Sequence, residues 1–81
     1  MKTFHLTVAK VGENLFDGEA FSVSLPGREG AFQILAEHEP CVAELTEGEM
    51  RIKAADDQLH RFEVPEGGLA EVSFNQATIL L

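Results

Sequence analysis

The segment Phe21-Ser22-Val23-Ser24-Leu25-Pro26-Gly27 decides the fold that this sequence predicts. Its apolar side chains fall on alternate residues, and this period of two is typical of a β-strand with one buried face. Pro26-Gly27 is expected to end the strand in a type II turn, because proline fixes φ at about −65° and glycine accepts a positive φ. We therefore expect Phe21, Val23 and Leu25 to point into a core.

The same pattern recurs in both directions along the chain. No window shows a sustained apolar period of 3.6 residues, so no helix of ordinary length is expected. Turn signals separate the strands, among them Asp17-Gly18, Asp56-Asp57 and Pro65–Gly68, and a surface crossover is expected over residues 36–39. The pattern predicts an all-β fold, a two-sheet antiparallel β-sandwich of about ten short strands, with residues 1–81 as one domain. Further strands or apolar runs are expected at 4–9, 32–35, 41–45, 50–54, 60–64, 69–72 and 77–81.

Composition narrows the classes of function. The 81 residues allow one domain, and 44% hydrophobic with 25% charged residues is ordinary for a globular protein. Fourteen acidic residues against six basic ones give a net charge of −8, which argues against nucleic-acid binding. A single cysteine cannot form an internal disulfide, and the N-terminus reads as a strand rather than a signal peptide. A soluble, cytoplasmic protein is expected.

No cluster of reactive residues makes a persuasive active site. His38 and Cys41 lie three residues apart, but their neighbours are carboxylates, which would raise rather than lower the pKa of a thiol. His5, His38 and His60 lie on separate elements, so no close-spaced pair of metal ligands is available. We expect no catalytic residue, no metal and no cofactor, and we favour function by binding.

Six short motifs stand in order along the chain: Phe16-Asp17-Gly18-Glu19, Val23-Ser24-Leu25-Pro26-Gly27, Glu29-Gly30, His38-x-Pro40, Gly48-x-Met50-Arg51-Ile52 and Gly67-Gly68-x-x-Glu71-Val72. Taken together, they resemble the epsilon subunit of F-type ATP synthases. The resemblance covers residues 3–81 and identifies the family's N-terminal β-sandwich domain.

The resemblance implies a non-catalytic rotor subunit of the central stalk, at the cytoplasmic face of the bacterial inner membrane. It would link the gamma subunit to the membrane c-ring of a proton-translocating ATP synthase during ATP synthesis, and would bind no small molecule. The c-ring side would be formed by Arg28, Glu29, Gly30 and Ala31. The gamma side would be formed by Lys10, His38, Cys41, Val42 and Ala43.

Three residues depart from the family pattern in the central loop. Gln33, Ala36 and Glu37 stand where Gly, Pro and Gly are usual, so the backbone there is where a difference is expected. Family members often continue into two C-terminal helices that inhibit ATP hydrolysis, whereas this sequence stops at Leu81. A natural end would leave a subunit that couples but does not inhibit through those helices, and a truncation would have removed that regulation.

The alternative function is a free-standing β-sandwich that binds a ligand and is unrelated to ATP synthase. Such modules often display aromatic platforms, and the chain has no Trp or Tyr.

Overall fold

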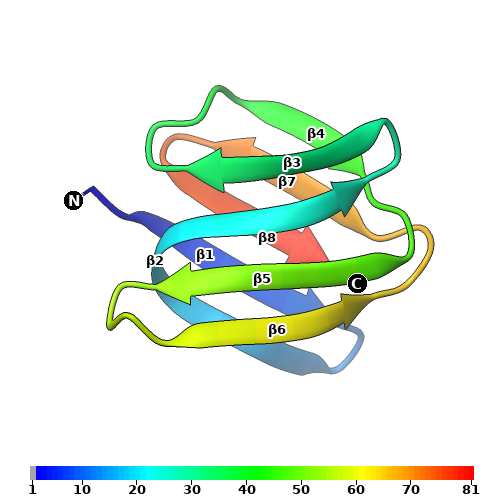
Figure 1. The fold of residues 1–81 in the computed structure, drawn as a ribbon, viewed down its shortest axis with the longest axis horizontal. Coiled ribbons are helices and arrows are strands. Elements are labelled where there is room, and N and C mark those ends of the chain that lie inside the picture. Colours follow the sequence, from blue (N-terminus) through cyan, green and yellow to red (C-terminus); the bar gives the residue numbers. More distant parts are fainter. Residues whose placement is uncertain (1) are drawn as a thin grey trace.

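The computed structural model describes residues 2–81, and in them the chain forms eight β-strands and no helix (Figure 1). No helix long and apolar enough to span a membrane occurs in this part of the chain. The expected all-β architecture is confirmed. The strands are β1 (Phe4–Lys10), β2 (Glu13–Gly27), β3 (Gly30–Leu35), β4 (Cys41–Glu44), β5 (Gly48–Ala54), β6 (Leu59–Val64), β7 (Leu69–Ser73) and β8 (Gln76–Leu80).

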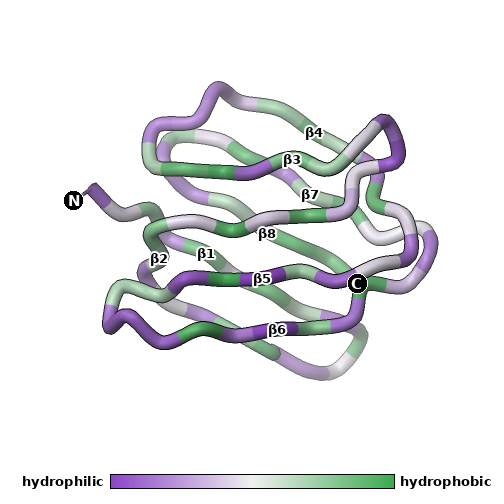
Figure 2. The backbone as a smooth tube through the Cα atoms, in the orientation of Figure 1, coloured by the Kyte–Doolittle hydropathy of each residue, from purple (hydrophilic) through white to green (hydrophobic). Residues whose placement is uncertain are grey.

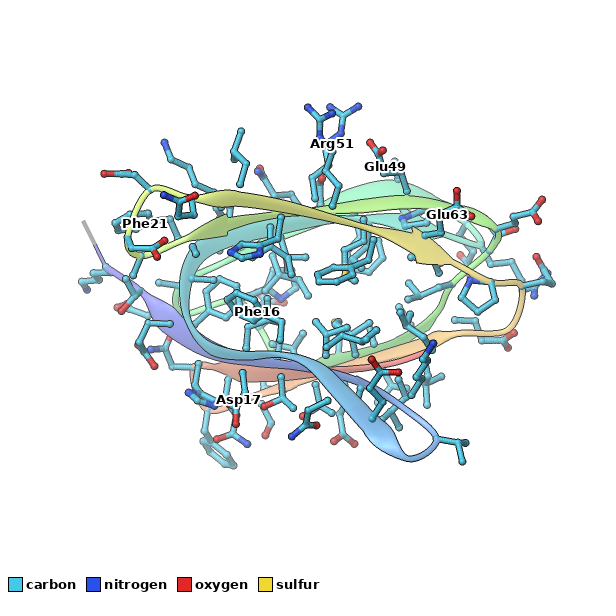
Figure 3. The ribbon with its side chains drawn as sticks, turned by 90° about the horizontal axis from the view of Figure 1, so that it is seen from below. Phe16, Asp17, Phe21, Glu49, Arg51 and Glu63 are labelled. Carbon is cyan, nitrogen blue, oxygen red and sulfur yellow. The ribbon has the colours of Figure 1, made fainter. Side chains whose placement is uncertain are left out.

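The strands form two layers that share β2. The first layer has the order β4-β7-β8-β1-β2, and the second continues from β2 through β5 to β6, with β3 on the other side of β2. All pairings are antiparallel except that of β1 with β8, which is parallel. Figure 3 shows the layers edge-on, with Phe16 between them and Asp17 directed outward.

Alternation explains how each strand fills the core. Hydropathy alternates along the backbone (Figure 2), and the inward positions of β5 are Met50, Ile52 and Ala54, all buried. Thirteen other residues complete the buried apolar set, and no polar or charged residue is buried among the described residues. These residues are Phe4, Leu6, Val8, Ala20, Val23, Leu25, Ile34, Leu45, Val64, Ala70, Val72, Ala77 and Ile79, with Met50 and Ile52 in the same cluster.

The turn expected at Asp17-Gly18 is absent, which is why eight strands are found rather than about ten. Gly18 pairs with Leu6 and Asp17 with Thr7, so both residues belong to the ladder between β1 and β2. The side chain of Asp17 also contacts the His5 ring across the strands, with 2.6 Å between Oδ1 and Nε2. Pairing with β1 therefore overrides the local preference of an Asp-Gly pair for a turn.

The prediction that Phe21 points into the core is wrong. The register of β2 against β5 shifts between Ala20 and Ser22, which leaves Phe21 without a partner in β5. This bulge changes which side of β2 faces inward, so that Ala20 and Val23 are buried while Phe21 is half-buried outside the core cluster. Figure 3 shows Phe21 near one end of the sandwich.

Two smaller expectations also differ from the structure. The apolar run at 32–35 does not turn inward throughout, since Leu35 is exposed and Ile34 takes the inward position at the end of β3. Gly27 does not have the positive φ expected of a type II turn. That conformation belongs to Gly30, with φ of 129°, across a two-residue loop.

Candidate functional site

The hairpin between β2 and β3 presents the residues expected on the c-ring side. Gly27 pairs with Gly30, so Arg28 and Glu29 form the exposed two-residue tip, followed by exposed Ala31. Gly27 is needed here because a β-carbon would come within 2.6 Å of the Gly30 oxygen and 2.8 Å of the Phe32 ring. The local sequence therefore produces a tight, projecting tip with a charged end.

Arg28 connects this tip to two other loops. Its Nε donates to Glu44 Oε2 at 3.1 Å, and its Nη2 donates to Glu66 Oε1 at 2.5 Å. Glu44 ends β4, and Glu66 lies in the turn between β6 and β7. Both carboxylates raise the pKa of the Arg28 guanidinium above its ordinary value, and the Glu66 carboxylate has the larger effect.

Backbone hydrogen bonds join the same three segments. Thr46 N donates to Pro26 O at 2.8 Å, and Arg28 N donates to Glu44 O at 2.9 Å. Leu45 N donates to Gly68 O at 2.7 Å, and the Leu45 side chain is fully buried beneath the loops. We call the β2–β3 tip (28–29), the β4–β5 loop (45–47) and the β6–β7 turn (65–68) the loop platform. All three lie at the same end of the sandwich in Figure 1.

A cleft of about 730 Å³ runs from the tip along the edge of β4. Val42 and Ala43, expected on the gamma side, line this cleft together with the four residues expected on the c-ring side. The structure therefore brings the c-ring set and part of the gamma set to adjacent surfaces rather than to opposite sides of the domain.

The other gamma-side residues are dispersed. Half-buried His38 lies in the β3–β4 crossover, where its ring Nδ1 donates to Glu39 O at 2.7 Å. Cys41 begins β4 and packs against the core as a free thiol. Lys10 is the last residue of β1, at the end of the first layer opposite to the crossover, and its Nζ lies 3.5 Å from Glu13 Oε1. Contact with all of them would require a partner that spans the outer face of that layer.

The outer face of the first layer carries an apolar row that sequence reasoning missed. Leu69 in β7 pairs with Leu80 in β8, and Leu80 pairs with Ala9 in β1. The side chains of Leu69 and Leu80 are 37% and 49% exposed, and Val42 on neighbouring β4 is 65% exposed. The signal was available, since Ala70 and Ile79 are the inward residues and the adjacent leucines must therefore face outward. We call Val42, Leu69 and Leu80 the apolar row.

The crossover has the unusual backbone that its sequence suggested. Glu37 has φ of 63°, a left-handed conformation that glycine adopts more easily. Its N–H donates to Asn75 Oδ1 at 2.7 Å, and its carboxylate lies 2.5 Å from Lys2 Nζ. These contacts, together with a donation from Asn75 Nδ2 to Thr3 O at 2.9 Å, fasten the crossover to the β7–β8 turn.

The other titratable cluster lies on the outer face of β1 and β2. His5 contacts Asp17 through Nε2 and Glu19 through Nδ1, at 2.6 and 3.2 Å, and both hydrogen bonds raise the pKa of the imidazole. Within residues 2–81 no three His, Cys, Asp or Glu side chains gather in a way that could hold a metal ion.

Comparison with known proteins agrees with the fold. Residues 3–81 match the ATP synthase delta/epsilon chain β-sandwich domain. The ATP synthase epsilon chain of Chlorobium limicola is 39% identical over 79 residues, which are 98% of this chain and 89% of that protein. The epsilon chain of Delftia acidovorans is 38% identical over 80 residues, covering 99% of this chain but only 57% of the longer relative.

Solved structures show the same fold at lower identity. A chain of the Euglena gracilis mitochondrial ATP synthase, in a structure of its OSCP, F1 and c-ring parts, aligns with a TM-score of 0.87 and 21% identity over 96% of this chain and 49% of that one. A chain of the Tetrahymena thermophila central stalk and c-ring aligns with a TM-score of 0.78 and 17% identity over 98% of this chain and 63% of that one. An epsilon chain is a structural or regulatory subunit of a membrane-associated complex, not a catalytic one. With a family match over nearly its whole length, the chain belongs to the ATP synthase delta/epsilon chain β-sandwich family.

Proposed function

We propose that the chain is a central-stalk subunit of a proton-translocating F-type ATP synthase that links the gamma subunit to the membrane c-ring for ATP synthesis. The observation that carries the proposal is the match of residues 3–81 to the family domain, with bacterial epsilon chains among the relatives. The bacterial epsilon chains among its relatives support a site of action at the cytoplasmic face of the inner membrane. The chain acts through its surfaces, since those described above hold no reactive cluster.

The tip of the β2–β3 hairpin faces the c-ring in this proposal. The Glu29 carboxylate makes no hydrogen bond or ion pair within the described residues, whereas the charge of Arg28 is already matched by Glu44 and Glu66. An exposed carboxylate at a projecting tip suits a basic loop on the partner. Such complementarity contributes orientation and association rate more than affinity.

The outer face of the first layer contacts gamma. The apolar row supplies an exposed apolar surface on this face, at the end of β7 and β8 that lies next to the loop platform. Contiguous exposed apolar side chains on a soluble domain mark interaction surfaces. Cys41, Val42 and Ala43 line the β4 edge of the same contact.

The test for gamma binding compares two exposed leucines on opposite layers. Leu80→Ser removes the more exposed of the two leucines in the apolar row, and Leu59→Ser makes the same change on β6, where Leu59 is 66% exposed. We expect Leu80→Ser to weaken the complex with the cognate gamma subunit about tenfold, which is the effect of losing an interface contact worth about 1.4 kcal/mol. Leu59→Ser should bind as the unmodified chain does.

Sizing chromatography and calorimetry with purified gamma measure both variants, and circular dichroism confirms that each is folded. Equal weakening by the two substitutions would mean that the first layer is not the gamma surface. His38→Asp tests the crossover separately, because it places a carboxylate beside Glu37 and Glu39 while leaving the strands unchanged. Unchanged affinity for gamma in this variant would remove the crossover from the contact.

A further inference from the structure

We infer that Arg28 is a positioning residue that holds the loop platform rigid, so that Glu29 is presented to a basic partner loop in a fixed direction. The inference rests on the proposed function, in which the β2–β3 tip meets the c-ring. It concerns the neighbour of the contacting carboxylate rather than the carboxylate itself. Arg28 would thus act on binding without touching the partner.

The geometry of the guanidinium supports this role. Two of its nitrogens are used by carboxylates from different loops, Glu44 at 3.1 Å and Glu66 at 2.5 Å. A planar guanidinium can serve two carboxylates at a fixed angle, which a lysine ammonium cannot do in the same directional way. The side chain therefore joins the tip to loops that lie 16 and 38 residues away in the sequence.

Glu66 is held in place from several directions. Its Oε2 accepts hydrogen bonds from Thr46 Oγ1 at 2.8 Å and from Glu47 N at 3.3 Å, while its Oε1 accepts from Arg28. The donors from Thr46, Arg28 and Glu47 lower the pKa of this carboxyl below its ordinary value. The ion pair at Arg28 is thus one part of a network that spans all three loops of the platform.

Preorganisation gives the network a consequence for binding. A loop that is ordered before the encounter loses less conformational freedom on binding than a loop that must be ordered by the partner. The platform has backbone bonds of its own at Arg28, Leu45 and Thr46, and the Arg28 side chain adds a further link from the tip to the β6–β7 turn. Loss of that link would leave the strands folded and the direction of Glu29 less defined.

The sign of the effect separates positioning from simple electrostatics. Arg28→Ala removes a positive charge from a chain whose net charge is already −8, so attraction to a basic loop should increase. A positioning role predicts the opposite result, weaker binding. If Arg28 instead contacted the partner directly, Glu66→Gln would release it and binding would not weaken.

This chain is first assembled with gamma, and the complex is then bound to the cognate c-ring in detergent micelles. The experiment measures the affinity and the association and dissociation rates of that binding at two ionic strengths. The variants are Arg28→Ala, Arg28→Lys, Glu66→Gln and the double variant of Arg28→Ala with Glu66→Gln. Arg61→Ala and Glu63→Gln, at exposed positions on β6, make the same changes of charge outside the hydrogen-bond network of the platform. Glu29→Gln reports on the proposed c-ring contact itself.

We expect Arg28→Ala and Glu66→Gln each to weaken c-ring binding about three- to tenfold, mostly through faster dissociation. The double variant should be no weaker than the more affected single one, because both substitutions break one unit. Arg28→Lys should recover only part of the loss, and the two β6 controls should change affinity less than twofold.

A second measurement uses the free chain and does not depend on the partner. The backbone N–H groups of residues 28 and 46 donate hydrogen bonds across the platform. Their amide hydrogen exchange should become faster in Arg28→Ala and stay unchanged in Arg61→Ala. Unchanged exchange in both variants would overturn the inference.

The remaining outcomes are distinct. Binding by Arg28→Ala that equals or exceeds that of the unmodified chain, or weakening by Arg28→Ala without weakening by Glu66→Gln, would overturn the positioning role while leaving the proposed function in place. Unchanged binding by Glu29→Gln would overturn the c-ring contact, and with it the effect assigned to Arg28 on binding.

Discussion

Truncation of two apolar residues on adjacent strands tests whether the bulge in β2 is placed correctly. Strict alternation makes Phe21 a core residue whose loss would cost about 3–5 kcal/mol, while the structure leaves it half-buried beside the shifted register. Full burial of such a side chain contributes about 1.5–3 kcal/mol, so we predict that Phe21→Ala costs about 1–1.5 kcal/mol. Ile52 is fully buried between β2 and β6, and Ile52→Ala should cost about 2–5 kcal/mol.

These costs are large for an 81-residue domain, whose total stability is about 4–12 kcal/mol. Urea titration followed by far-UV circular dichroism is the suitable assay, since the chain has no Trp or Tyr to report by fluorescence. With a slope of about 1 kcal/mol per molar urea, the midpoint should fall by about 1 M in Phe21→Ala and by 2 M or more in Ile52→Ala. A loss at Phe21 as large as that at Ile52 would refute the bulge and restore the simple alternation.

Three further predictions concern single side chains. The hydrogen bond to Asp17 raises the pKa of His5 above 6.5, so its stabilising contribution is complete below that pH and is lost as pH rises through the raised value. His5→Asn should flatten this fall in urea midpoint, and a midpoint that rises from pH 6 to 8 in the unmodified chain would contradict the assignment. Phe74 is 93% exposed with φ of 46°, so Phe74→Asn should stabilise the domain by about 0.5–1 kcal/mol, and a lower melting temperature would argue otherwise. A β-carbon on Gly27 would lie 2.6 Å from a backbone oxygen, so Gly27→Ala should lower the free energy of unfolding by about 1–3 kcal/mol. Gly18→Ala should be close to neutral, because the nearest contact of its β-carbon would be at 3.9 Å. Equal losses of stability in the two variants would contradict this packing.

Much of the fold could be predicted from the sequence because each strand carries its own alternation. The inward residues of β5, β6 and β7 follow directly from period two, and the turns at Asp56-Asp57 and Phe74-Asn75 follow from loss of that period. What failed was the interior of β2. An Asp-Gly pair favours a turn in isolation, but whether it turns depends on a partner strand, here β1, that the local sequence does not contain.

The candidate site also has a part that could be predicted from the sequence and a part that only the folded chain reveals. The exposed tip at Arg28 and Glu29 was visible in the sequence because glycines flank it. The partners of Arg28 were not, since Glu44 and Glu66 reach it only after both layers have formed. The apolar row could have been found from Leu69 and Leu80, each of which breaks the alternation of its strand, but it becomes a surface only when β7 and β8 pair.

The membership of β2 in both layers has a mechanical consequence. Most two-layer packings resist sliding only through side-chain contacts, whereas here a continuous backbone crosses from the ladder with β1 to the ladder with β5. A tangential load applied to the outer face of the first layer would reach the β2–β3 tip along covalent bonds and rows of hydrogen bonds pulled in shear. Slippage between the layers would first have to break the ladder of one half of β2. The domain is therefore stiff against sliding of one layer over the other.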